Sequence, residues 1–305
     1  MNRNPKQRLG LLALLLGMLA ATAAAGAQAR PLVALIIDDL GWRAADGERA
    51  VHLHGAVTMA ILPHAPHSRA LAETAHRLGK EVMLHLPMEA VGGNRLGPDA
   101  LTEALGEKAF KRTVFDGLAA VPYVRGINNH MGSRLTADPL RMRWLMQTLM
   151  FRSDLYFVDS RTTARSVAER EARRRALSAT HRDVFIDYKD DPDTIDTQLE
   201  KLIDRAHSKG SALGIGHPLP KTLAALERWL PTLERQGVEL VPVSRLIAWR
   251  QRQRRNPTWQ ASLFPSLKVA KNSKQSPSSI SCAGRESRSS PPASPTGPCA
   301  AAVAR

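Results

Sequence analysis

The chain has 305 residues, with 43 Lys and Arg residues against 28 Asp and Glu residues, and its formal net charge is +15. The excess charge lies at the two ends, because residues 1–30 carry four bases and no acid and residues 250–305 carry ten bases and one acid. The nearly neutral middle argues against a nucleic-acid-binding face, which needs clustered Lys and Arg. An apolar content of 43% is normal for a globular protein and excludes disorder of the whole chain.

The amino end has the layout of a secretory signal peptide. Three basic residues precede an apolar run over 9–25, which ends in the small-x-small pattern Ala27-Gln28-Ala29. We therefore predict a signal peptide over 1–29 and a periplasmic or secreted protein with no membrane span after cleavage. The alternative is an uncleaved membrane anchor, for which the run is slightly short.

The carboxyl end differs in composition from the rest of the chain. Residues 256–305 contain 11 Ser and 7 Pro with little periodic apolar pattern, which predicts a disordered tail. Both cysteines, Cys282 and Cys299, lie in this tail. The predicted single domain over 30–255 therefore has no thiolate chemistry and no Cys-ligated zinc site.

Short apolar runs alternate with helix-compatible stretches through this domain. The first run, LVALIIDD, is apolar on consecutive positions, as in a strand buried on both faces. Eight such units predict an α/β fold, a distorted (β/α) barrel of seven to eight units, with an open doubly wound sheet as the alternative. The predicted strands are 32–39, 57–62, 81–88, 126–130, 156–160, 184–187, 212–217 and 238–243.

Four of the intervening stretches read as helices, over 68–78, 138–152, 194–208 and 219–236. Asp138-Pro139 and Asp193-Thr194 supply helix start signals, and Gly210 is one of the glycines placed where a helix should stop.

Ionisable residues gather at the ends of five predicted strands. In a parallel barrel, all carboxyl strand ends open on one face, and that face carries active sites. We therefore expect residues distant in sequence to converge on one pocket. They are Asp38, Asp39, His85, His130, Asp159 and His217.

Each of these residues also has an ordinary structural interpretation. An Asp after a strand often caps the following helix, and a single His is often a core or surface residue. Two adjacent carboxylates at the mouth of a buried strand, however, repel each other unless a cation lies near them. The other histidines lack strand-end placement; His64, which follows the second strand, is the best of them.

An Asp with two His and no Cys suits a borderline divalent metal such as zinc. Three protein ligands leave a position for a water molecule, which the metal acidifies. The remaining Asp could take its proton, and a separate His could protonate the leaving group. This set describes hydrolysis of an amide or ester. Adjacent carboxylates do not suit a glycosidase, and no phosphate-binding glycine loop supports nucleotide chemistry.

Six motifs in order resemble the divergent polysaccharide deacetylase family over about 31–250. The resemblance implies a distorted (β/α) barrel and a metal-dependent deacetylase activity on an N- or O-acetylated glycan, with a divalent metal, zinc above all, as cofactor. One departure is that no His-x-x-x-His pair, the source of two ligands in mainstream deacetylases, lies on a suitable strand end. The motifs are LIIDDLG, ILPHAPH, EVMLHLPME, GINNHMGS, YFVDSRT and GIGHP.

The same resemblance implies roles for individual residues. Asp38 looks like the general base, His217 like the general acid, and Asp159 like a pocket carboxylate that orients a neighbour. The metal ligands implied are Asp39, His85 and His130, and the substrate contacts expected in the same motifs are Glu89, Asn129 and Ser133.

Two functional classes remain open on the sequence alone. One is a metal-dependent deacetylase that acts on an acetylated cell-envelope or exported polysaccharide. The other is a non-catalytic periplasmic protein that keeps the barrel pocket to bind a glycan or a partner. Stoichiometric metal would separate them, because a binding module has no need of it.

Overall fold

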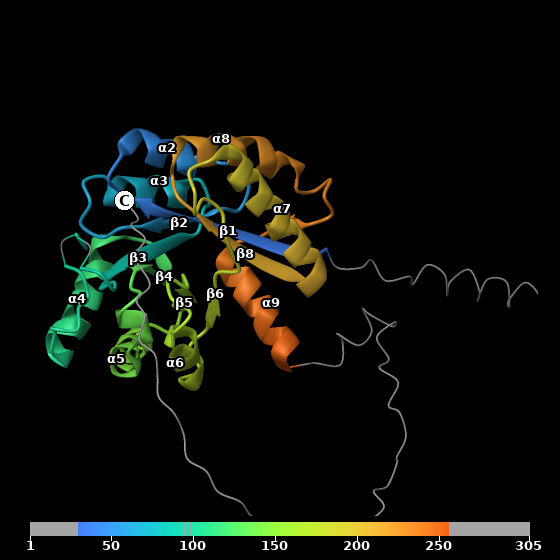
Figure 1. Cartoon of the computed structure of the whole chain (residues 1–305). Coiled ribbons are helices and arrows are strands. Elements are labelled where there is room, and N and C mark those ends of the chain that lie inside the picture. The colour runs from blue at the N-terminus through green and yellow to red at the C-terminus, as the bar shows by residue number, and fades with distance from the viewer. Residues whose placement is uncertain (1–29, 94, 98, 256–305) are drawn as a thin grey trace, which may run out of the picture. The chain divides into compact units, whose positions relative to one another are not determined.

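The computed structural model describes residues 30–93, 95–97 and 99–255. The predicted signal peptide over 1–29 and the predicted tail over 256–305 lie outside the described residues. Strands and helices alternate along the described part of the chain (Figure 1).

Nine parallel strands form one sheet in the order β6-β5-β4-β3-β2-β1-β8-β7, with β9 beside β1. Each of the eight runs predicted as strands overlaps one of them, which confirms those predictions, whereas the sequence does not identify β6. The strands are β1 (Leu32–Leu40), β2 (Thr58–Ile61), β3 (Val82–Met88), β4 (Val124–Met131), β5 (Tyr156–Asp159), β6 (Ala179–His181), β7 (Val184–Phe185), β8 (Ser211–Gly216) and β9 (Glu239–Leu240).

The sheet curls until its two ends meet at a seam between β6 and β7. These strands stand at opposite ends of the order, yet only Arg182 and Asp183 separate them in the chain. The Arg182 N–H donates to the carbonyl of Asp159 in β5 at 2.9 Å, and the Asp183 N–H donates to the carbonyl of Leu213 in β8 at 2.9 Å. The distorted (β/α) barrel is therefore confirmed and the open sheet is wrong, because an open sheet keeps its outer strands apart.

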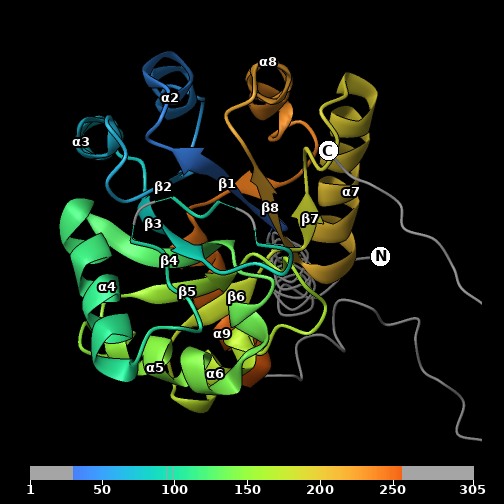
Figure 2. The ribbon, with the colours of Figure 1, turned by 60° about the vertical axis from the view of Figure 1, so that its left-hand side comes forward.

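The helices stand around the outside of the curled sheet, and α9 lies at one end of it (Figure 2). Within the described ranges, no helix is both long and apolar enough to cross a lipid bilayer. The described helices are α2 (Ala44–Val51), α3 (Ser68–Arg77), α4 (Glu107–Ala120), α5 (Pro139–Leu149), α6 (Ala168–Arg174), α7 (Pro192–Lys209), α8 (Pro220–Trp229) and α9 (Val243–Arg255), with 3-10 turns η1 (Leu135–Ala137) and η2 (Leu230–Thr232).

Local side-chain chemistry sets where these helices begin and end. Asp138 caps α5 as predicted, because its carboxylate accepts from the N–H groups of Leu140 and Arg141. Gly210 ends α7 in the left-handed conformation, with a φ of 77°. The predicted start of α7 is wrong by two residues, since Asp191, ahead of Pro192, provides the cap in place of Asp193.

Alternation along the strands divides the core into an outer and an inner layer. Residues such as Val33, Leu35 and Ile37 of β1 face outward and pack with the surrounding helices. Leu32, Ala34 and Ile36 of the same strand face inward. The inner layer also contains Met83, Tyr156, Val158, Leu213 and Ile215, and it is closed at the amino ends of the strands by Val243, Leu246 and Ile247 of α9.

Helix α9 also holds the seam together through Arg250. Its guanidinium donates to the hydroxyl of Thr180 in β6 at 2.7 Å and to the hydroxyl of Ser211 in β8 at 3.0 Å. It also pairs with the carboxylate of Asp183 between β6 and β7. Because both side chains of this ion pair are largely buried, α9 supplies polar contacts where the sheet has no ladder between β6 and β7.

We predict that Arg250→Met destabilises the fold by about 2–4 kcal/mol. Breaking a buried ion pair usually costs about 3–5 kcal/mol. We expect a somewhat smaller loss of stability here, because Arg205 still contacts Asp183. Urea unfolding followed by circular dichroism measures it, with exposed Arg252→Met on the same helix as the matched control. Equal unfolding free energies for the two variants would contradict a structural role of α9 at the seam.

Candidate active site

The carboxyl ends of the strands surround a cavity of about 190 Å³. It contains five of the residues that the sequence predicts to converge, together with other side chains of β4, β7 and β8 and of the loops after β5 and β6. A larger hollow of about 510 Å³ lies at the amino ends of β3 and β4 and contains none of the predicted site residues. The lining of the smaller cavity is Asp38, Asp39, His85, Asn129, His130, Met131, Ser160, Thr162, Arg182, Phe185, Ile215 and His217.

Asp38 and Asp39 both reach the cavity although they are consecutive residues of one strand. In a regular strand they would point to opposite faces of the sheet. Asp38 continues the inward series of Leu32, Ala34 and Ile36, whereas Asp39 adopts the left-handed conformation with a φ of 58°. The pairing of β1 with β2 also shifts register between Ile37 and Leu40. This bend turns the Asp39 carboxylate back toward the cavity. Its cost is a backbone conformation that residues other than Gly rarely adopt.

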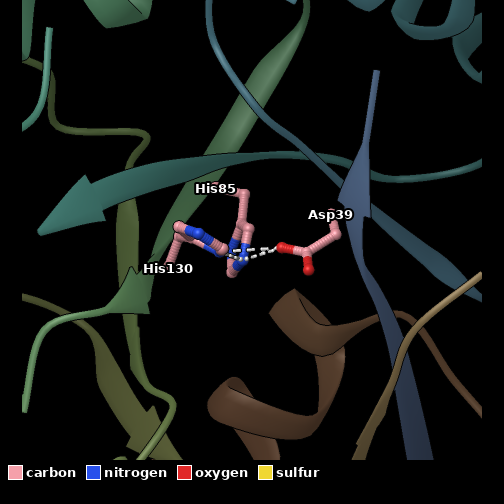
Figure 3. A group of neighbouring side chains, drawn as sticks. All are labelled: Asp39, His85 and His130. Atoms are coloured by element: carbon pink, nitrogen blue, oxygen red, sulfur yellow. Dashed lines mark hydrogen bonds and ion pairs between the residues drawn. The ribbon is translucent and has the colours of Figure 1, made fainter. Parts of the chain in front are cut away.

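Asp39, His85 and His130 meet at one point (Figure 3). Asp39 Oδ1 lies 3.0 Å from His85 Nε2 and 2.8 Å from His130 Nδ1, and the two nitrogens are 3.1 Å apart. The three side chains come from β1, β3 and β4, so residues more than 40 positions apart in the sequence form the cluster. The structure thus brings together the three residues predicted as metal ligands.

A chain of hydrogen bonds fixes the orientation of His85. The Asn128 side-chain amide donates to Asp38 Oδ1 at 2.7 Å, so its carbonyl oxygen faces His85 Nδ1, 2.8 Å away. This carbonyl can only accept, and therefore His85 carries its proton on Nδ1 and directs the Nε2 lone pair at the cluster. Asn128 is not among the site residues predicted from the sequence, although it stands two residues before His130 and shares its strand face.

The cluster fits a divalent cation. Asp39 Oδ1 is buried and accepts no well-aligned hydrogen bond from any described residue, even though two imidazole nitrogens approach it closely. Three electron-pair donors facing one point require a proton or a cation between them. A tetrahedral ion with zinc-like bond lengths holds its ligand atoms about 3.3 Å apart, so the observed contacts need to open by only a few tenths of an ångström.

The two neighbouring carboxylates have opposite pKa shifts. Burial raises the pKa of Asp38 above its ordinary value, although His85 and His217 act against this change. Burial also tends to raise the pKa of Asp39, but the contacts with His130 and His85 outweigh it and hold that pKa below its usual range. Asp39 is therefore ionised, as a ligand must be, and Asp38 is the carboxylate that takes up a proton more readily.

His217 lies on the other wall of the cavity and is paired with Asp187. Its Nδ1 is 2.9 Å from Asp187 Oδ1, while the His217 backbone N–H and the Thr222 hydroxyl donate to Asp187 Oδ2 at 2.7 and 2.8 Å. Burial lowers the pKa of His217, but the hydrogen bond and charge of Asp187 prevail, helped by Asp38 and Asp39, and raise it to about 9. Nε2 is left facing Asp39 Oδ2, 3.9 Å away.

Asp187 is not among the site residues predicted from the sequence. Its signal was nonetheless available, because Asp187 ends a predicted strand in the same way as Asp38 and Asp159. Asp159 itself holds the loop after β5: its oxygens accept from the Arg161 N–H at 2.9 Å and the Ser166 hydroxyl at 2.7 Å. The neighbours that Asp159 orients are therefore loop residues, and the carboxylate paired with the site histidine is Asp187.

The three residues predicted to contact substrate lie in different places. Asn129 lines the cavity and joins β4 to β5, since its side-chain oxygen accepts from the Ser160 N–H at 2.9 Å. Ser133 accepts from the Val91 N–H at 2.9 Å, and Glu89 accepts from the Glu103 N–H at 2.7 Å. Glu89 and Ser133 do not line the cavity. Their contact with substrate stays a prediction.

Fold and site together define a curled parallel (β/α) barrel with a carboxylate–imidazole cluster at the carboxyl ends of its strands. The chain belongs to the divergent polysaccharide deacetylase family, whose sequence pattern matches residues 35–247. The resemblance found in the six motifs is thereby confirmed.

Three bacterial proteins are similar to this chain in sequence or in structure. The uncharacterized protein YibQ of Escherichia coli is 35% identical over 215 residues, which cover 70% of this chain and 67% of YibQ. An uncharacterized Haemophilus influenzae protein is 33% identical over 229 residues, covering 73% and 78% of the two chains. The crystal structure of an uncharacterized Agrobacterium tumefaciens protein matches with a TM-score of 0.69 at 25% identity, over 73% of this chain and 91% of the other.

We predict that the purified protein binds one divalent cation per chain and that Asn128→Ala weakens this binding about 10–100-fold, because His85 loses the partner that fixes its tautomer. His130→Ala should abolish stoichiometric binding. Exposed His64→Ala is the control, since His64 contacts Asp99 outside the cavity. Metal analysis and calorimetry with Zn²⁺ measure these changes. Equal affinities for the Asn128 and His64 variants would contradict the site.

Proposed function

We propose that the chain is a metal-dependent hydrolase that removes acetyl groups from an N- or O-acetylated polysaccharide of the cell envelope or of exported material. The observation that carries this proposal is the arrangement of the cavity. Asp39, His85 and His130 meet at one point, and two further proton-transfer groups, Asp38 and His217, line the same cavity. Membership in the divergent polysaccharide deacetylase family supports the substrate class.

Asp39, His85 and His130 would hold the divalent cation, for which zinc suits two imidazoles and one carboxylate. A bound cation supplies Lewis acidity, which polarises an acetyl carbonyl and acidifies water. The protein contributes the orientation of the ligands, because Asn128 fixes the tautomer of His85 and the bend at Asp39 aims its carboxylate. The two imidazoles of the cluster come from different strands, His85 from β3 and His130 from β4. The cluster therefore needs no His-x-x-x-His segment.

Asp38 suits the role of general base. Its Oδ1 accepts from Asn128, which leaves Oδ2 without a hydrogen-bond partner among the described residues. Burial raises the pKa of this carboxyl toward the range in which a base works best near neutral pH. In the proposed reaction, Asp38 takes the proton of the attacking water. Asp39 cannot share this task, because its oxygen is already engaged by the two imidazoles.

His217 suits the role of general acid. Asp187 holds its Nδ1 side, so Nε2 is the nitrogen that faces the cavity. A pKa of about 9 keeps the imidazole protonated at neutral pH, which is the state that can donate to a leaving amine or alkoxide. The buried Asp187 has the orienting role that the sequence assigned to Asp159.

The site of action follows from the sequence rather than from the fold. A signal peptide over 1–29 would deliver the protein to the periplasm or the outside of the cell, where acetylated polysaccharides are found. Recovery of the mature protein from a periplasmic fraction, beginning after Ala29, tests this part of the proposal.

Substitutions at the two carboxylates separate their roles. We predict that Asp38→Asn keeps the metal and lowers acetate release about 10²–10⁴-fold, the usual loss when a general base is removed. Asp39→Asn should lower metal content itself. Acetate release from a panel of acetylated glycans and metal analysis of each variant measure the two effects. Asp116→Asn, an exposed site on α4, is the control.

Other outcomes of this experiment have definite meanings. Loss of metal in Asp38→Asn with retention in Asp39→Asn would show that the two roles are exchanged. Unchanged metal content and acetate release in both variants would reject the deacetylase site. The protein would then be the non-catalytic glycan- or partner-binding alternative.

The pH dependence of turnover tests the acid. Because His217 must be protonated to donate, we predict that kcat falls as the pH rises through its pKa. Asp187→Asn removes the anionic partner that raises this pKa, so the alkaline limb should move to lower pH. The same substitution at exposed Asp190 is the control. An alkaline limb that stays in place in the Asp187 variant would contradict the assignment of His217.

A further inference from the structure

Arg182 is a cationic side chain of the cavity that the proposed reaction does not use. It belongs to the seam between β6 and β7, and its guanidinium is held in three ways. Nε donates to the Ser160 carbonyl at 2.6 Å and Nη2 donates to the Arg161 carbonyl at 3.0 Å. The guanidinium carbon also lies 4.6 Å from the centre of the Phe185 ring. The side chain is therefore rigid before any ligand arrives.

No described carboxylate forms an ion pair with Arg182. Asp159 is near in sequence to the carbonyls that Arg182 contacts. Both of its carboxylate oxygens, however, already accept hydrogen bonds, from the Arg161 N–H and the Ser166 hydroxyl. Asp38 acts on Arg182 through its charge, but the two groups are not within ion-pair distance. Both Nη1 hydrogens and the second Nη2 hydrogen thus have no protein partner in the described part of the chain, which leaves an Nη1/Nη2 fork open. The side chain is half-buried in the cavity wall.

A fixed guanidinium with free donors is suited to one kind of ligand. Its planar fork matches the two oxygens of a carboxylate, and such charge-assisted pairs are among the stronger hydrogen bonds in proteins. The cavity of about 190 Å³ is smaller than the roughly 300–1,000 Å³ of pockets that hold drug-sized ligands. It therefore has room for a substituent of a polymer rather than for an oligosaccharide.

We propose that Arg182 forms a carboxylate subsite in this cavity. The proposal rests on the proposed function for the nature of its ligand, because two carboxylates would then reach Arg182. One is the carboxylate of an acidic sugar in the substrate, such as a uronic acid, and the other is the acetate that deacetylation releases. Both would bind through the same two-pronged contact.

Binding to the metal-free protein tests the subsite without any reaction. The probes are ¹³C-labelled acetate followed by NMR, an O-acetylated oligouronate, and a neutral chitin oligosaccharide. We expect acetate to bind the metal-free wild type and Arg182→Gln to weaken that binding about 10–100-fold. Arg161→Gln is the matched control, because it removes the same charge from the neighbouring loop after β5, and the Arg161 side chain does not line the cavity.

The glycan probes decide between the two sources. If Arg182→Gln weakens the oligouronate about tenfold or more relative to chitin oligosaccharide, the subsite reads an acidic sugar. If acetate alone depends on Arg182, the subsite holds the product. Acetate that fails to bind the metal-free wild type, or that binds equally to the Arg182→Gln and Arg161→Gln variants, overturns the subsite even if the protein proves to be a deacetylase.

A second variant, which keeps the positive charge, covers the case in which Arg182→Gln is destabilised. Arg182 joins two loop carbonyls at the seam, so thermal melting of Arg182→Gln must match that of the wild type for its result to count. If it does not, Arg182→Lys decides, because an ammonium keeps the charge but cannot make the forked contact. Unchanged acetate affinity in Arg182→Lys overturns the forked contact, and a loss of about three- to tenfold supports it.

Discussion

Three ligand atoms meet at one point at the mouth of the barrel, and all three can act as electron-pair donors only if a cation lies between them. Asp39 Oδ1, His85 Nε2 and His130 Nδ1 lie within 3.1 Å of one another, and the carboxylate oxygen accepts no aligned hydrogen bond from a described residue. Such an arrangement is repulsive unless positive charge enters it. The surrounding structure maintains it nonetheless: three strands of one sheet fix the side chains, and Asn128 prevents His85 from turning its N–H toward the cluster.

Strand alternation explains why most of this site could be predicted. Asp38, His85, His130 and His217 all occupy inward positions of their strands at the carboxyl end, so a correct strand assignment places them in one cavity. Asp39 breaks the alternation and reaches the cavity only through a left-handed residue and a register shift. Sequence patterns do not reveal such a bend, because a single left-handed residue leaves no periodic signal.

The seam between β6 and β7 is the part of the fold that the sequence pattern predicts least well. β6 and β7 are three and two residues long, too short for a hydrophobic period to be recognised, and they bond to strands at opposite ends of the sheet. Their position is set by partners far away in the chain, among them Arg250 of α9. Arg182 lies between these two strands and Asp187 follows β7. Arg182 lines the cavity and Asp187 pairs with His217 only because the sheet curls. The places of Arg182 and Asp187 thus share one cause, the closure of the barrel.

Environment gives the two adjacent carboxylates different tasks. Burial raises the pKa of Asp38 although His85 and His217 act against it, whereas two imidazoles lower the pKa of Asp39 despite its burial. Pairs of titratable groups whose pKa values are pushed apart commonly divide acid, base and ligand roles. A raised pKa is also a limit, because a base must be ionised before it can accept a proton. Positive charge held by Asp39 beside Asp38 would lower the pKa of Asp38 again. On the proposed mechanism, a cation in the neighbouring cluster therefore favours the ionised form of Asp38, which couples proton transfer to metal binding through two consecutive residues.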